Sequence, residues 1–147
     1  MDNLTYRMTA PPNDYPEWVI NDVPLVELLG VSEAGLVPPL VWWDAEIAAK
    51  RLLLATPSLL PTGRQALLVC GVCGDIGCGV ISADVKEQRG AILWSNFAWE
   101  SGLVNDPEGH PSPDLEEFAG IGPFYFDRER YHRIIGEMLH VGAPANR

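Results

Sequence analysis

The sequence predicts an α+β fold in which a central antiparallel β-meander is flanked by a few helices, including a C-terminal amphipathic helix. Three observations predict this fold. Residues 65–70 form an unbroken apolar run, residues 80–85 and 91–97 have strand patterns, and residues 131–138 repeat apolar side chains at helical spacing. The chain has 147 residues, of which 47% are hydrophobic, so one buried core is possible and we expect a single domain over residues 1–147.

Three elements are expected in the N-terminal third of the chain. The pair Asn21–Asp22 tolerates turn geometry and stands between two apolar stretches, which indicates a small hairpin. Residues 25–29, followed by Gly30, are typical of a short helix with a left-handed glycine after its end. Asp44 is a candidate N-cap for a helix whose apolar spacing continues to Thr56.

The centre of the chain predicts the strands of the meander. Residues 65–70 have the length of a strand that is buried on both faces. Residues 80–85 alternate, which places Ile81, Ala83 and Val85 toward the core. The segment Glu87–Gly90 is a plausible hairpin turn, so residues 91–97 return as the next, antiparallel strand.

The last third of the chain predicts a loop, two helices and a strand. Residues 100–117 lack a strand period and read as a long surface loop. Pro113 and the acids after it satisfy the rules for a short acidic helix that ends near Gly120. Residues 124–126 predict a brief aromatic strand. Asp127 then caps the C-terminal helix. Its apolar side chains fall on one face at helical spacing, namely Tyr131, Ile134, Ile135 and Met138, and Gly142 and Pro144 end it.

The charge of the chain excludes two classes of partner. Ten Lys and Arg stand against 20 Asp and Glu, so the formal net charge is -10 and the pI is about 4.6. Such a protein repels phosphate backbones and anionic lipid surfaces, so we expect no nucleic-acid partner and no membrane partner. The sequence has no apolar stretch near the roughly 18 residues of a membrane span, and its start lacks a secretory leader, so we expect a cytoplasmic protein.

All three cysteines of the chain stand within nine residues. Cys70, Cys73 and Cys78 have the spacings C-x2-C and C-x4-C, and the first pair with the glycine that follows resembles a zinc knuckle. Structural zinc sites have four ligands, so a fourth ligand has to be found. The candidates are Asp75, His110, His132, His140 or a water molecule.

Two other interpretations of the cysteines stay open. The C-x-x-C spacing is also that of dithiol oxidoreductases, but there the reactive thiol stands at a helix N-terminus, whereas the glycines here indicate a strand-to-strand turn. Alternatively, the thiols are small apolar groups in a glycine-rich hairpin. No nucleophile elbow, phosphate-binding loop or paired-histidine motif accompanies them, which favours a protein that is not an enzyme.

Four short motifs follow one another along the chain: W-x-I-N-x-x-P-L at residues 18–25, L-L-V-C-G-x-C-G-D-x-G-C-G at 67–79, W-x-x-F at 94–97 and P-F-x-F-D-R-x-x-Y at 123–131. In this order they resemble a group of small, mostly uncharacterised bacterial proteins that are common in actinobacteria. The resemblance implies an α+β domain. It carries no catalytic residues over to this chain, although some members of the group have a loose oxidoreductase label.

The uneven charge suggests a function. Residues 91–126 hold six acids and no base, and an acidic loop with neighbouring aromatic residues could steer and anchor a basic protein. We therefore expect a non-enzymatic acidic binding protein, of the kind that neutralises a basic toxin domain as an immunity protein. The alternative is a small zinc-binding or thiol redox protein that uses the three cysteines. The residues expected to bind the partner are Trp99, Glu100, Asp106, Glu108, Asp114, Glu116, Glu117 and Phe118.

Overall fold

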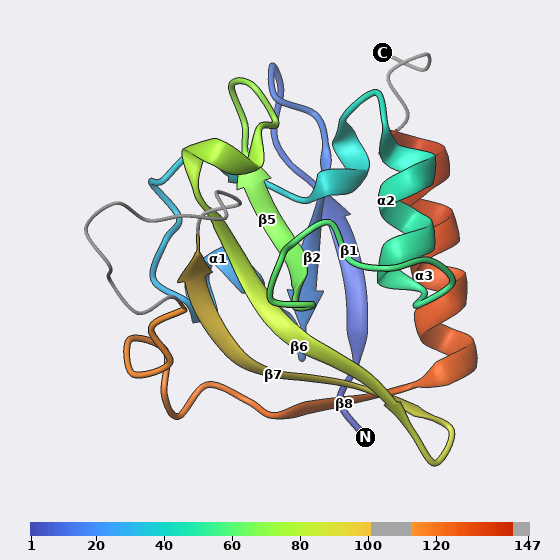
Figure 1. The fold of residues 1–147 in the computed structure, drawn as a ribbon. Helices are drawn as coiled ribbons and strands as arrows, with labels where there is room; N and C mark the ends of the chain where they lie inside the picture. Colours follow the sequence, from blue (N-terminus) through green and yellow to red (C-terminus); the bar gives the residue numbers. More distant parts are fainter. Residues whose placement is uncertain (101–112, 143–147) are drawn as a thin grey trace.

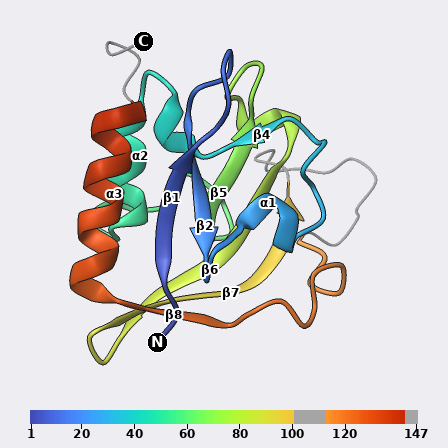
Figure 2. The same cartoon turned by 180° about the vertical axis from the view of Figure 1, so that it is seen from behind.

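The computed structural model describes residues 1–100 and 113–142, and in them it has the predicted α+β architecture. Two antiparallel sheets face each other, and helices α2 and α3 lie along one side of them (Figures 1 and 2). The elements in chain order are β1 (Leu4–Met8), β2 (Pro16–Ile20), β3 (Val23–Pro24), α1 (Leu25–Leu28), β4 (Leu36–Val37), the 3-10 helix η1 (Pro39–Val41), α2 (Ala45–Leu52), β5 (Gln65–Cys70), the 3-10 helix η2 (Ile76–Cys78), β6 (Val80–Gln88), β7 (Ala91–Glu100), β8 (Phe124–Asp127) and α3 (Arg128–Gly142).

The smaller sheet has the strand order β1-β2-β3. Its second hairpin turns at Asn21 and Asp22, whose φ angles are +51° and +69°, so the predicted turn is confirmed. Asn and Asp tolerate this left-handed region better than most residues. The side chain of Asn21 also accepts a hydrogen bond from the backbone N–H of Asn3, which ties the turn to the start of β1.

The larger sheet has the order β4-β5-β6-β7-β8, and all its pairs are antiparallel, which confirms the predicted meander. The register shifts between Ala66 and Leu68 on β5 and between Ser82 and Asp84 on β6. Bulges of this kind bend a strand and increase its twist. The long strands β6 and β7 accordingly curve across the molecule, so that the sheet curls (Figure 1).

Two predicted helices differ from the structure. The acidic helix expected after Pro113 is wrong, because residues 113–123 form turns in which Gly120 and Gly122 have φ angles of +91° and +79°. Helix α2 ends at Leu52 rather than near Thr56, since Leu54 already has a left-handed φ of +61°. At the other end of α2, the side chain of the expected N-cap Asp44 makes no capping hydrogen bond.

Helix α3 has the predicted amphipathic face and the predicted cap. Asp127 accepts a hydrogen bond from the backbone N–H of Arg130 at 3.0 Å, as an N-cap residue does. The apolar positions of the helix are buried, and they pack toward the centre of the fold: Tyr131, Ile134, Ile135 and Met138. At the centre, the ring of Trp94 makes edge-on contacts with those of Trp18, Phe126 and Tyr131, with ring centroids 5.1–6.0 Å apart.

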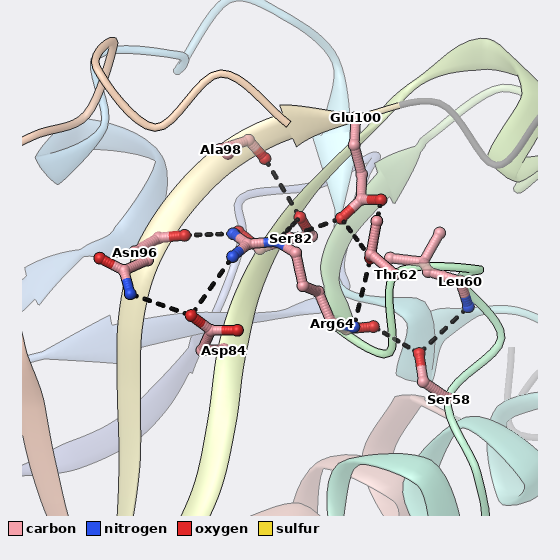
Figure 3. Close-up of polar contacts among 9 residues, drawn as sticks. All are labelled: Ser58, Leu60, Thr62, Arg64, Ser82, Asp84, Asn96, Ala98 and Glu100. Carbon is pink, nitrogen blue, oxygen red and sulfur yellow. Dashed lines mark hydrogen bonds and ion pairs between the residues drawn. The ribbon is translucent and has the colours of Figure 1, made fainter. Parts of the chain in front are cut away.

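A buried arginine joins three strands of the curled sheet. Arg64 immediately precedes β5 and is only 6% exposed, and its guanidinium forms an ion pair with Glu100 on β7 at 3.2 Å. It also contacts Asp84 at 3.5 Å, the hydroxyl of Ser82 at 3.0 Å and the carbonyl of Asn96 (Figure 3). Because these partners lie on β6 and β7, the side chain holds the start of β5 against both strands.

Glu100 therefore belongs to the fold rather than to a surface loop. It is the last residue of β7 and is 5% exposed, and the hydroxyl of Thr62 donates to its carboxylate at 3.0 Å. The expectation that Glu100 begins an exposed acidic loop is wrong, because the strand continues to this residue and its charge neutralises Arg64. The rest of the expected loop up to residue 112 lies outside the described residues.

Replacing Arg64 by methionine should lower the free energy of unfolding by about 3–5 kcal/mol, because Glu100 then stays buried without its ion-pair partner. The matched control is Arg133→Met on the exposed face of α3, which should change stability by less than about 0.5 kcal/mol. Urea unfolding followed by circular dichroism measures both. Equal stability of the two variants would contradict the role assigned to Arg64.

Candidate functional site: a cluster of three thiols

The structure brings the three cysteines together at one end of the curled sheet. Cys70 is the last residue of β5, Cys73 lies in the turn that follows, and Cys78 ends η2. Their Sγ atoms all lie within 4.8 Å of one another, and those of Cys73 and Cys78 are 3.2 Å apart. Cys73 and Cys78 are exposed and Cys70 is partly buried, so the cluster faces solvent.

Two glycines let the chain fold so tightly here. A Cβ on Gly71 would lie 2.5 Å from the carbonyl oxygen of Gly35, the residue to which the N–H of Gly71 donates. Gly74 has a φ of +70°, and a Cβ there would lie 2.8 Å from the indole of Trp42. Glycine has no Cβ and tolerates a positive φ, so it meets the close approach at both positions and the φ of Gly74 without strain. The N–H of Gly74 then reaches back to the carbonyl of Cys70 at 3.0 Å and closes the turn.

Backbone amides point at two of the sulfur atoms. The N–H of Val72 donates to Sγ of Cys70, and the N–H of Asp75 donates to Sγ of Cys73, each at 3.4 Å. In both cases the donor is two residues after the cysteine, so the turn repeats the same arrangement. Hydrogen bonds of this kind stabilise the negatively charged thiolate, which is the form that ligates metals.

Two of the thiols, Cys70 and Cys78, differ in acidity. The pKa of Cys70 is lowered to about 7, chiefly by the backbone amides of Cys73 and Val72 and also by the Cys73 thiol. The pKa of Cys78 is raised to about 11, first because its hydrogen bond with Cys73 favours the protonated thiol, and then by desolvation and by the neighbouring sulfurs. At neutral pH the Cys70 thiol is therefore partly ionised, whereas the Cys78 thiol is protonated.

The spacing of the sulfur atoms suits a tetrahedral zinc ion. Zn–S bonds of about 2.3 Å place two tetrahedral ligands roughly 3.8 Å apart. The three Sγ atoms lie within 4.8 Å of one another, so small side-chain rotations reach this geometry, and the 3.2 Å separation of Cys73 and Cys78 has to open slightly. The donor set therefore fits zinc or another thiophilic metal.

Within the described part of the chain, no fourth His, Cys, Asp or Glu joins the cluster. The side chain of Asp75 instead accepts a hydrogen bond from the N–H of Gly77 at 2.9 Å and caps η2. His132 and His140 lie on α3, at the opposite side of the molecule from the turn between β5 and β6 (Figures 1 and 2). His110 lies outside the described residues.

The acidic surface expected to bind a partner is only partly present. Asp114, Glu116 and Glu117 are exposed, as predicted, whereas Asp106 and Glu108 lie outside the described residues. Trp99 is half-buried against the core, and Phe118 is 6% exposed within it, so neither stands free as an anchor. Together with the burial of Glu100, this leaves Asp114, Glu116 and Glu117 as the described residues of the expected surface that are exposed.

The tryptophans differ in burial, which the sequence alone did not reveal. Trp94 is fully buried in the core, whereas Trp43 is 81% exposed. Trp42 packs against Gly74 and thereby supports the cysteine turn. Nothing in the local sequence pattern distinguishes the two neighbouring indoles, because the residues that cover Trp42 come from a distant segment.

No protein-family model, curated protein or solved structure gives a match to this chain. Among the described residues, no helix combines the length and the apolar composition that a membrane span requires.

The acidity of the thiols can be checked by alkylation. In the reduced, metal-free protein, Cys70 should be labelled by a short pulse of iodoacetamide with a midpoint near pH 7, and Cys78 only near pH 11, because the thiolate is the nucleophile. Mass spectrometry of peptides that carry a single label measures the pH midpoint for each of the two cysteines. In urea the differences should disappear, and equal midpoints in the folded protein would contradict the assigned hydrogen bonds.

Proposed function

We propose that this protein binds one zinc ion through the thiolates of Cys70, Cys73 and Cys78. The observation that carries the proposal is the convergence of three sulfur atoms within 4.8 Å in a turn whose amides donate to two of them. Thiolates are soft ligands, which favours zinc or copper(I) over magnesium or calcium. Zinc is the ion we expect, since the spacing approaches that of its tetrahedral thiolate sites.

The proposed site leaves a coordination position for an external ligand. Structural zinc sites are closed by four protein ligands, whereas sites with three protein ligands keep a fourth position for water or another molecule. The exposure of Cys73 and Cys78 leaves that side of the cluster open to solvent. Such a site can exchange its fourth ligand or transfer its metal ion to another molecule. A closed structural site resists both.

A thiol redox function is the second candidate, and one distance favours it. Sγ of Cys73 and Sγ of Cys78 are 3.2 Å apart, so a disulfide between them needs little movement. Hydrogen peroxide would supply the oxidising equivalents: two thiols lose two protons and two electrons, an S–S bond forms, the O–O bond breaks, and two waters form. Zinc and oxidation compete for the same sulfurs, so one experiment can separate the two functions.

Binding of a basic protein stays a prediction, as does the narrower idea of an immunity protein. It now depends on Asp114, Glu116 and Glu117, which are exposed, and on residues outside the described ranges. A rim of exposed acids mainly raises the association rate and makes it sensitive to salt. The thiol cluster has the more specific geometry, and for that reason we place the metal site first.

Titration of the reduced protein with zinc against a chromophoric chelator should give one equivalent bound, with affinity that falls as the pH drops because protons compete for the thiolates. Cys73→Ser should weaken zinc binding by more than about 100-fold. Losing a residue that only orients a metal ligand already costs about 10–100-fold in affinity, and losing the ligand itself should cost more. The matched control is Val72→Ser in the same exposed turn, which leaves all three sulfurs in place.

The rival function is tested in the same samples. Hydrogen peroxide should join Cys73 to Cys78 in metal-free protein, and bound zinc should slow this reaction. Substoichiometric zinc together with rapid disulfide formation would replace the metal site by the redox function. Weak zinc binding that Cys73→Ser does not change would overturn the proposed site.

A further inference from the structure

Two sulfur atoms of the thiol cluster are closer together than a tetrahedral ion would place them. Sγ of Cys73 and Sγ of Cys78 are 3.2 Å apart, whereas two thiolates on a tetrahedral zinc ion lie about 3.8 Å apart. A centre whose bond angles are close to a right angle brings its sulfur ligands nearer to each other than a tetrahedral centre with bonds of similar length. The separation of this pair therefore suits a pyramidal centre better than a tetrahedral one.

The number of ligands also points to a three-coordinate centre. Three thiols converge within 4.8 Å, and among the described residues no further His, Cys, Asp or Glu completes the set. The carboxylate of Asp75, which lies between Cys73 and Cys78 in the sequence, accepts the N–H of Gly77 at 2.9 Å instead. Zinc has to take a fourth ligand from outside this set. Trivalent arsenic and antimony bind three thiolates and carry a lone pair at the fourth position, for which the exposed side of the cluster leaves room.

The fold holds the backbone positions from which the three sulfur atoms come. Cys70 ends β5, and Cys78 ends η2 two residues before β6 begins, and these two strands are paired in the larger sheet. Cys73 precedes Gly74, which lies so close to the indole of Trp42 that a Cβ has no room there. Ligands that are already gathered lose less conformational entropy on binding than ligands on a disordered chain.

We propose that the thiol cluster binds trivalent arsenic, or its antimony analogue, through the sulfur atoms of Cys70, Cys73 and Cys78 together. This binding rests on the thiol site of the proposed function, although not on zinc as its ion. Thiolates are soft ligands and favour soft, thiophilic centres of this kind.

The reaction is a substitution without any oxidation. Arsenous acid, As(OH)3, exchanges its three hydroxyl groups for the three cysteine sulfurs. Three S–H bonds and three As–O bonds break, three As–S bonds and three O–H bonds form, and three waters leave. Arsenic stays trivalent throughout. Arsenous acid is uncharged at neutral pH, so the net charge of -10 does not repel it.

The test is a titration of the reduced, metal-free, full-length protein with sodium arsenite, followed by mass spectrometry under non-denaturing conditions. One equivalent should bind, and the protein should gain the mass of one arsenic atom and lose that of three hydrogens. A complex with only two As–S bonds keeps one hydroxyl group on arsenic and is heavier by one water. X-ray absorption at the arsenic edge should show three sulfur neighbours and no oxygen neighbour.

A second arsenical separates a three-sulfur site from a simple pair of thiols. Phenylarsine oxide forms only two As–S bonds and releases one water. Cys70→Ser should weaken arsenite binding by about tenfold or more, because loss of a ligand costs at least as much as loss of a residue that orients one. The same variant should bind phenylarsine oxide almost as well as the unchanged protein, since Cys73 and Cys78 remain as a close pair. The matched control is Val72→Ser, which keeps all three sulfurs and should bind both arsenicals normally.

The outcomes for arsenite and for zinc are read independently, because no zinc is present in the arsenite titration. Absence of arsenite binding, a complex with only two As–S bonds, or an arsenite affinity that Cys70→Ser does not change would each overturn three-sulfur binding of arsenic. If the protein then still binds one zinc ion, the proposed zinc site stands. Conversely, three-sulfur binding of arsenite by a protein that takes up no zinc would overturn the zinc site alone.

Discussion

The buried charge of Arg64 constrains how the larger sheet can form. Removing a guanidinium from water is costly unless its charge is paired and its N–H groups are bonded. The partners come from two other strands of the sheet: Asp84 from β6 and Glu100 from β7. Strands β6 and β7 must therefore present these carboxylates to one point, and the bulge between Ser82 and Asp84 lies at that point. The curl of the sheet and the burial of one arginine thus belong to the same arrangement.

This constraint extends to the thiol cluster through β5. Arg64 fixes the start of the strand, and the indole N–H of Trp18 bonds to the carbonyl of Leu67 in its middle at 2.8 Å. Beyond its end, Gly71 bonds to Gly35. A strand held at three places gives Cys70 a defined position, from which a short turn brings Cys73 and Cys78 back to it. The cluster is exposed, yet the strand that carries it is attached to the rest of the fold at these three places.

The sequence predicted those parts of the fold whose signals are local. The face of α3, the cap at Asp127 and the turn at Asn21 and Asp22 follow from periodicity and turn chemistry, and all three are present. Glu100 was misplaced because its partner, Arg64, stands 36 residues earlier, and no local pattern links an acid to a distant base. The cysteine spacing predicted a common turn. It could not predict how the sulfurs share protons, since this depends on amide directions that only the folded backbone defines.

The burial of Glu100 also changes what the acidity of the chain means. The formal net charge of -10 suggests a surface that attracts a basic protein, but Glu100 and Asp84 neutralise Arg64 inside the fold. The remaining net negative charge creates a field around the whole protein. A field of this kind raises the local concentration of any cation and is not selective for a protein. Selectivity has to come from a site with defined geometry, and a cluster of soft, partly ionised thiols would supply it for a thiophilic metal ion that the field attracts.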